Sequence, residues 1–430
     1  MQSPDEGVHL LRAHLLTKGV LVLDTISGHR SGGYVDENLW DYQLRASGAL
    51  AADYDKKVTR DNKNDLSAIE WSGKTLFAPI PTTGYYFPLI YAPQAVGLLV
   101  GELAGLTVQQ SYYLARLCAF LGSMLLIGIA VHLFPPSPVV IGLVLMPISI
   151  FQFVSASMDG VAVALAVLCI SLYMRGSIKL TAFPDWMSYV LAAGLFILVT
   201  SRIQVLAFIL MPFVLALQHR RALYLLQGLG LAVLSAGWLY LAISQTVDGG
   251  IHHPGHSHFD VARHYLTNIS ELSSVLTATL DSRANQLAYL YGFIGILGWL
   301  DASFSTTFYK VMAIAFGLVI VLSVSLSNFK ETWQARLGLI IMFLASVFTV
   351  LFALLVQWNP FPATSIEGIQ GRYFIVPCCA LGYALSGATG FKSIPARLAI
   401  IGLLVMLAMV SMSMPQLLLD RYFIGTGPAP

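Results

Sequence analysis

Long apolar runs alternate with short polar stretches over most of this chain of 430 residues. Runs of the length needed to cross about 30 Å of hydrocarbon, or close to it, occupy residues 111–133, 137–154, 158–174, 186–201, 203–217, 222–244, 308–327, 336–357, 373–389 and 394–414. Because these runs hold few charges, the pattern predicts about ten transmembrane helices. The expected fold class is an all-α polytopic membrane protein.

Two further apolar segments are too interrupted to be predicted as spans. Residues 85–106 contain two prolines, three glycines and Glu102, so we interpret this segment as a helix lying along the outer interface. Residues 286–300 are short and rich in glycine, which favours a partly embedded outer helix. No internal repeat is visible.

The same pattern divides the chain into five parts. We expect an extracytoplasmic first loop with interfacial helices at 1–107, transmembrane helices at 108–244, an outer His-rich loop at 245–307, further transmembrane helices at 308–415 with an outer loop at 358–372, and a tail at 416–430. Residues 1–83 hold 20 of the 46 Lys, Arg, Asp and Glu residues, so the first part resembles a soluble block.

Composition and charge agree with membrane insertion. The chain is 57% hydrophobic and 11% charged, whereas soluble proteins are about 25% charged. Its net charge of +2 offers no field suited to nucleic acid, which excludes that class of partner. The four cysteines lie in apolar runs, where we interpret them as small buried residues.

The basic residues between the runs predict the orientation. They fall at every second gap, in the loops 175–180, 218–222, 328–336 and 390–397. The positive-inside rule places these loops in the cytoplasm. The block 1–107 and the loops 245–307 and 358–372 then face outside.

The first candidate site is the sequence PDEGVH at 4–9. Proline followed by two acids is suitable for starting a helix, because acids complement the helix dipole. Alternatively, Asp5 or Glu6 is a carboxylate held at the membrane surface as a general base or metal ligand, with His9 one turn further on.

Two more polar groups lie at the predicted outer ends of apolar runs. Asp159 either caps the helix that follows it or lines a cavity open to the outside. Arg202, with Gln204 beside it, cannot be a positive-inside anchor on this side of the membrane. It either binds an anion such as a lipid phosphate or pairs with an acid such as Asp159.

The last outer loop ends in the stretch QGRYF, which includes Gln370, Arg372 and Tyr373. Arg372 either extends to the interface or makes a second phosphate contact. Five of the ten histidines gather at 252–264. Pro254 and Gly255 favour a mobile loop there with adventitious metal affinity over a defined metal site.

Together, PDEGVH (4–9), QGRYFIVP (370–377) and the stretch from the interfacial segment into YYLARL (112–117) resemble membrane glycosyltransferases of the GT-C class. The chain is most similar to a bacterial multispanning family of formerly unknown function. That family carries PDE-x-x-H in its first outer loop and QGRYF-x-x-P in its last.

The resemblance implies a GT-C-like bundle at the bacterial cytoplasmic membrane, with its active site facing outside. It implies that Asp5 is the catalytic carboxylate, supported by Glu6 and His9. Arg202 would hold the lipid phosphate, and Arg372 and Tyr373 would complete the donor pocket. Asp159, Gln204 and Gln370 are added as substrate-binding candidates from their positions at the outer face.

Family members place a transmembrane helix before the acidic motif, so we also expect a first span upstream of Met1. The expected activity is inverting transfer of a sugar from a polyprenyl-phosphate donor to a surface glycan or a lipid-linked saccharide. A lipid-linked saccharide transporter and a surface-polysaccharide polymerase or ligase are the alternatives. No metal ligand is assigned, and a divalent metal ion is left open as a cofactor.

Overall fold

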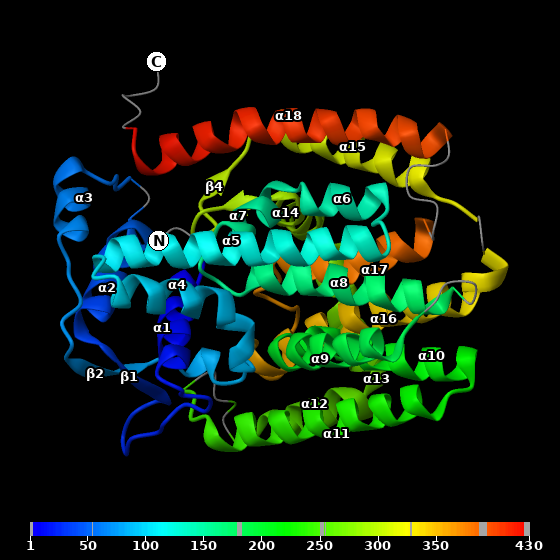
Figure 1. Cartoon of the computed structure of the whole chain (residues 1–430), viewed down its shortest axis with the longest axis horizontal. Coiled ribbons are helices and arrows are strands. Elements are labelled where there is room, and N and C mark those ends of the chain that lie inside the picture. The colour runs from blue at the N-terminus through cyan, green and yellow to red at the C-terminus, as the bar shows by residue number, and fades with distance from the viewer. Residues whose placement is uncertain are drawn as a thin grey trace.

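A computed structural model describes residues 3–53, 55–178, 183–249, 253, 255–326, 329–386 and 394–424 (Figure 1). Pro254 lies outside these ranges, as do parts of the loops predicted at 175–180, 252–264, 328–336 and 390–397 and the end of the predicted tail at 425–430.

Six helices in the described ranges are long and apolar enough to cross a membrane. They are α5 (Val108–Leu133), α8 (Asp159–Ser177), α11 (Ala222–Gln245), α15 (Thr306–Ser323), α16 (Phe329–Gln357) and α18 (Ile394–Tyr422). Helix α8 is central, since nearly all of its residues are buried.

The outer helices expose apolar side chains instead of polar ones. On α5 the exposed side chains Leu117, Leu121, Leu125 and Ile129 recur every four residues and form one stripe along the helix. Such a stripe is stable against lipid but not against water. The fold is therefore an all-α polytopic membrane protein, as the sequence predicts, apart from two small two-stranded ladders.

Six of the ten predicted runs form long continuous helices in the described residues, and the other four form short or interrupted ones. Residues 137–154 form two helices, α6 (Pro138–Val144) and α7 (Pro147–Phe153). Pro147 explains the break, since proline cannot donate to the preceding turn and disfavours helical geometry in the residue before it.

The other three runs are short in a similar way. Helix α9 (Asp185–Ser201) has 17 residues. It is followed by η3 (Ile203–Ile209), which contains non-helical backbone at Val205, and then by α10 (Leu210–His219). The run from 373 begins inside η4 (Gly371–Phe374) and continues as α17 (Ile375–Ser386).

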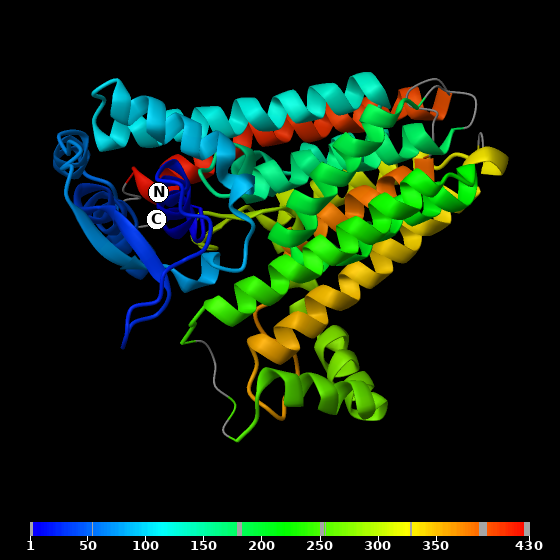
Figure 2. The same ribbon diagram turned by 60° about the horizontal axis from the view of Figure 1, so that its bottom comes forward.

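The first 107 residues form a separate cap at one end of the bundle (Figures 1 and 2). It contains α1 (Glu6–Thr17), β1 (Gly32–Asp36), α2 (Glu37–Ala52), α3 (Arg60–Ser67), β2 (Thr75–Pro79), η1 (Pro81–Thr83), η2 (Pro88–Tyr91) and α4 (Ala92–Leu103). Strands β1 and β2 pair antiparallel, with Tyr34 opposite Phe77. Helix α4, in the predicted interfacial segment, packs along the first part of α5.

The long loop between α11 and α15 holds α12 (His258–Thr267), α13 (Ile269–Asp281), α14 (Arg283–Ile294) and the ladder of β3 (Ile296–Leu297) with β4 (Ala302–Ser303). Figure 2 shows α12 and α13 projecting from the bundle near the end of α16. The apolar segment predicted at 286–300 therefore lies partly in α14 and partly in the β3–β4 hairpin.

Several basic loop residues gather at one end of the bundle. The described basic residues Arg175, Arg220, Arg221 and Lys330 all lie at the end opposite the cap, where α8, α10 and α16 end or begin (Figure 1). The cap end collects the starts of α5 and α8 and the end of α11. The candidate residues Asp5, Asp159, Arg202 and Arg372 all lie at this cap end.

Candidate functional site

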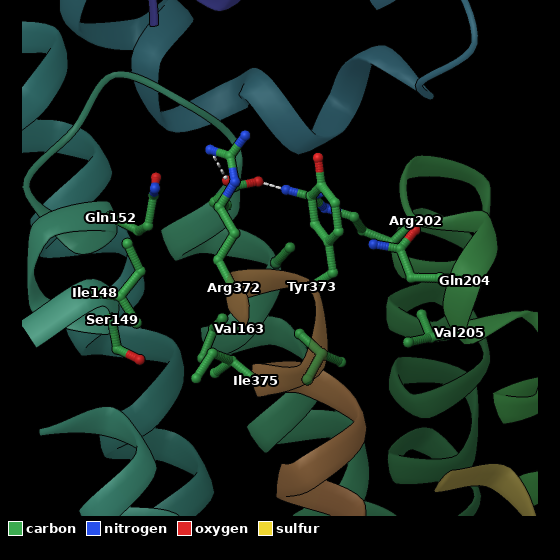
Figure 3. Close-up of a pocket in the computed structure, with 13 residues that line it drawn as sticks. Ile148, Ser149, Gln152, Val163, Arg202, Gln204, Val205, Arg372, Tyr373 and Ile375 are labelled. Carbon is green, nitrogen blue, oxygen red and sulfur yellow. Dashed lines mark hydrogen bonds and ion pairs between the residues drawn. The ribbon is translucent and has the colours of Figure 1, made fainter. Parts of the chain in front are cut away.

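A pocket at the cap end brings together three charged residues from distant parts of the chain. Asp159 is the first residue of α8, Arg202 follows the last residue of α9, and Arg372 lies in η4. The Asp159 carboxylate forms ion pairs with both guanidinium groups, and its Oδ2 is 3.3 Å from Nη1 of Arg372. In Figure 3 the two arginines approach from different walls of the pocket.

All three side chains are largely removed from water. Asp159 is 12% exposed, Arg202 14% and Arg372 10%. A buried carboxylate needs a partner to compensate for lost hydration, and this carboxylate has two. Two guanidinium groups around one carboxylate leave the pocket with an excess of one positive charge.

The pairing settles two alternatives that the sequence left open. Helix α8 has Met158 at its N-cap and no side-chain cap, so the interpretation of Asp159 as a capping residue is wrong. Its carboxylate turns to the arginines instead. Arg202 does pair with Asp159, as one of its two interpretations predicted.

Local backbone geometry explains why Arg202 enters the pocket. Its N–H still donates to Leu198 O at 2.8 Å, but its own φ and ψ of −140° and 81° leave the helix. The side chain therefore projects from the end of α9 and does not follow the lipid-facing surface. Arg372 is buried, so it does not extend into the interface as one interpretation proposed.

Two donors in this pocket have no partner. Nε of Arg372 and Nε2 of Gln152 are buried, and neither makes a hydrogen bond. Both residues line the pocket, with Gln152 on α7 (Figure 3). Buried polar atoms are nearly always satisfied in native proteins, so an anion held by both donors and both arginines would complete the site.

The opposite side of the pocket is apolar. Below the charged groups in Figure 3 lie Val163 of α8 and Ile375 of α17. The remaining apolar lining residues are Ile148, Ala162, Val205 and Val376. The pocket thus has a polar rim with an apolar floor, an arrangement that suits an amphipathic ligand with an anionic head.

Asp5 lies at the edge of this pocket. Its Oδ2 is 3.5 Å from Nη2 of Arg372, and its side chain is 61% exposed. The backbone of Asp5 adopts φ 60°, a left-handed conformation that is uncommon for residues other than glycine. Strained backbone of this kind clusters at functional sites. Asp5 therefore presents an accessible carboxylate next to the arginines.

Glu6 points away from the pocket although it is the next residue. It begins α1 and is 1% exposed. Its carboxylate accepts hydrogen bonds from Ala156 N at 2.7 Å and Tyr112 Oη at 3.0 Å, with Nε of Arg116 at 3.9 Å. Burial raises the pKa of Glu6, but the charge of Arg116 and the backbone donors outweigh this effect and lower the pKa overall. The charged form thus joins the cap to the bundle.

His9 lies close behind the pocket. Its Nδ1 is 2.7 Å from Tyr91 Oη, and its ring is 6.1 Å from that of Tyr86. Burial, together with the charges of Arg202 and Arg372, lowers the pKa of His9 to about 3. His9 is therefore neutral at physiological pH, and it can act as a hydrogen-bonding group but not as a cation.

The remaining candidates lie around the arginines. Tyr373 lines the pocket, and its ring lies 5.5 Å below the Arg372 guanidinium carbon. Gln204 also lines the pocket, on η3. Gln370 precedes η4 outside the lining set, and its Oε1 is buried without a partner. Six of the nine candidates thus gather at one pocket or its edge: Asp5, Asp159, Arg202, Gln204, Arg372 and Tyr373.

Gln152, Tyr86 and Tyr91 are not among the candidates that the sequence indicates. Gln152 is the single polar residue within the apolar stretch IFQFV, and a lone polar residue in a membrane segment is itself a signal of function. Tyr86 and Tyr91 lie in the segment that was interpreted as an interfacial helix. Their side chains were expected at the level of the lipid headgroups, and no local pattern in the sequence indicated that they contact His9.

The described ranges hold no group of three or more His, Cys, Asp or Glu side chains arranged to bind a metal ion. In the His-rich segment, His253 is buried and its Nε2 is 2.9 Å from Val356 O. His264 pairs with Glu271 at 2.7 Å. These two histidines therefore help to pack α12 and α13 against α16.

Comparisons with known proteins agree with this membrane architecture. No curated protein and no solved structure matches the chain. The family described as "Predicted membrane protein (DUF2142)" matches residues 1–381, which cover the cap, the pocket and every candidate residue. The match spans well over half of the chain. The chain therefore belongs to the DUF2142 family of predicted membrane proteins.

Proposed function

We propose that this protein is a glycosyltransferase that moves a sugar from a polyprenyl-phosphate donor to an acceptor outside the cytoplasm. The observation that carries the proposal is the joint placement of Arg202, Arg372 and an exposed Asp5 at one amphipathic pocket. A lipid phosphate needs fixed cations beside an apolar surface, and an acceptor hydroxyl needs an accessible base.

The proposed reaction is a single displacement with inversion. Asp5 takes the proton from the acceptor hydroxyl, and the hydroxyl oxygen forms a bond to the anomeric carbon of the sugar. The bond between that carbon and the phosphate oxygen breaks, and its electron pair leaves with the polyprenyl phosphate. Arg202 and Arg372 stabilise the charge that develops on this leaving group.

In this scheme the other two acidic-motif residues position the machinery. Glu6 anchors the start of α1 to α5 and to the backbone before α8, which fixes the neighbouring Asp5. His9, held by Tyr91, packs behind the arginines as a neutral ring. Gln152, Gln204 and Tyr373 supply further polar contacts to the donor.

The proposed orientation rests on the basic loops that gather at one end of the bundle. We place the end that carries Arg175, Arg220, Arg221 and Lys330 in the cytoplasm, because basic loops are retained there. The cap and the pocket then face the outside of a bacterial cytoplasmic membrane. The acceptor would be a cell-surface glycan or a lipid-linked saccharide.

A lipid-linked saccharide transporter is the second candidate, and the interrupted helices favour it. Carriers place their substrate sites at broken helices, and the pocket here is lined by α7, η3 and η4. The position of the charges at one end favours transfer, since a carrier needs a site that is reachable from both sides.

The test is release of polyprenyl phosphate from a labelled polyprenyl-phosphate sugar by purified protein in liposomes. Asp5→Asn and Arg202→Gln should each abolish release, because they remove the base and a phosphate contact. Asp185→Asn is the matched control, since Asp185 pairs with Arg221 at 2.9 Å on the exposed opposite end and should leave release unchanged.

Each result assigns one class. Release that depends on Asp5 supports the transferase. Movement of intact donor between leaflets without bond cleavage refutes it in favour of the transporter. Release only from a diphosphate-linked oligosaccharide refutes it in favour of a polymerase or ligase.

A further inference from the structure

The pocket holds a carboxylate in the place where an anionic ligand would bind. Asp159 contacts both guanidinium groups at once, from the first turn of a helix that is almost wholly buried. Such a contact balances part of the positive charge of the two arginines. It also means that a phosphate has to compete with Asp159 for the same donors.

The donors that Asp159 does not use mark where a ligand would make its first contacts. Nε of Arg372 and Nε2 of Gln152 are buried, unpaired and part of the pocket lining. Gln152 Oε1 is held by Ser157 Oγ at 2.9 Å, which fixes the orientation of its amide. These donors can therefore bind an anion initially while Asp159 still contacts both guanidinium groups.

The charge balance makes the carboxylate important for release. A sugar–phosphate–lipid diester carries one negative charge, whereas the product phosphate monoester carries about 1.5 to 2 at neutral pH. Two arginines alone would bind the more highly charged product more tightly than the donor. Asp159 balances one of these positive charges inside the pocket, and Asp5 adds a second negative charge at its edge, 3.5 Å from Arg372. The buried Asp159 carboxylate therefore disfavours retention of the more highly charged product.

We propose that Asp159 is an internal counter-ion that competes with the ligand phosphate for Arg202 and Arg372 and thereby speeds the departure of the phosphate monoester product. That the ligand is a lipid phosphate rests on the proposed function, whereas the competition between Asp159 and an anion for the two arginines does not. Asp159 is thus a positioning residue, since it acts on the ligand through the two arginines.

The test measures binding of a short-chain prenyl phosphate to the purified protein by calorimetry, without any sugar transfer. Asp159→Asn removes the competing charge at nearly constant shape and should tighten binding about tenfold or more, as expected for charges a few ångströms apart in a partly buried site. Asp159→Glu keeps the charge and should remain close to the unsubstituted protein. Asp185→Asn, an Asp beside an Arg at the other end, should change nothing.

Turnover provides a second readout. If the transferase proposal holds, Asp159→Asn should lower kcat, because product departs slowly, and should lower the inhibition constant of the monoester more than the KM of the donor. Unchanged or weaker prenyl phosphate binding by Asp159→Asn overturns the counter-ion proposal. Tighter binding in a protein that transfers no sugar sustains it and refutes the transferase instead.

A structure of the unsubstituted protein with bound prenyl phosphate tests the same proposal and does not depend on whether a substituted protein folds. The proposal expects the phosphate on both guanidinium groups and the Asp159 carboxylate displaced from at least one of them. A phosphate bound elsewhere, with both ion pairs of Asp159 intact, overturns the proposal.

Discussion

The adjacent carboxylates Asp5 and Glu6 should give opposite results when each is made neutral. Asp5 is largely exposed at the edge of the pocket, whereas Glu6 is buried and bonded to α5 and to the backbone of Ala156. Asp5→Asn should abolish sugar transfer and leave stability nearly unchanged. Glu6→Gln should destabilise the fold and reduce transfer only as far as the cap loses its position.

The magnitude follows from the contacts of Glu6. Its carboxylate accepts from Tyr112 Oη and Ala156 N and lies near Arg116. Hydrogen bonds to a charged group contribute about 1.5–3 kcal/mol each. Glutamine retains one acceptor oxygen, so Glu6→Gln should cost about 2 kcal/mol. Glu6→Ala leaves the buried donors unpaired and should cost about 3–5 kcal/mol.

Thermal unfolding in detergent, followed by intrinsic fluorescence, measures the first effect, and release of polyprenyl phosphate measures the second. The expected order of stability is Asp5→Asn close to the unsubstituted protein, then Glu6→Gln, then Glu6→Ala. A Glu6→Gln protein with unchanged stability and no activity would refute this reasoning, since it would make Glu6 the catalytic carboxylate.

Three further predictions concern the pH response, the far end of the chain and the backbone at Asp5. Burial lowers the pKa of His9 to about 3 and that of His14 to about 4, so both bind protons more readily when the protein is unfolded. The free energy of unfolding should therefore fall as the pH drops from 6.5 to 5, by about 1.4 kcal/mol per pH unit for each histidine. Urea titrations of a variant with both His9→Gln and His14→Gln should lose this pH dependence. Arg421 is buried, with its Nε 2.8 Å from Asp301 Oδ2. Arg421→Ala should therefore lower the free energy of unfolding, measured by thermal unfolding, by about 3 kcal/mol, and Arg421→Lys should lower it less. Equal losses in the two variants would contradict a role for the paired guanidinium group. Asp5→Gly relieves the strain of the positive φ and should raise the thermal unfolding midpoint slightly, by the equivalent of about 1 kcal/mol. The same variant should abolish sugar transfer. A fall in the midpoint would show instead that the Asp5 side chain stabilises the turn.

The membrane-spanning character was predictable because it depends on composition summed over long runs. The six full-length helices all coincide with predicted apolar runs, and the described basic loops share one end of the bundle. Helix length was harder to predict, because a single residue such as Pro147 divides an otherwise uniform run into α6 and α7. Hydropathy averages over such a break, so the apolar pattern alone does not show which runs are continuous helices.

The site was predictable in its members but not in its contacts. Asp5, Asp159, Arg202 and Arg372 were recognised because ionisable groups at the outer ends of apolar runs need a reason to be there. Which acid pairs with which arginine depends on how α8, α9 and η4 meet, and no local pattern encodes this. The opposite fates of Asp5 and Glu6 likewise depend on the backbone turn at Asp5.

The interruptions in the apolar helices also form the walls of the pocket. Gln152 comes from α7 after the break at Pro147, Gln204 from η3 after the end of α9, and Arg372 from η4 ahead of α17. A continuous helix would have satisfied its backbone internally and directed its side chains along lipid or a neighbour. An interrupted helix instead ends within the protein and can direct a polar side chain into the interior, which membranes permit only where protein or water surrounds it. Local departures from regular structure are expected where function requires them, and here the interruptions of the helices supply the polar side chains that line the pocket.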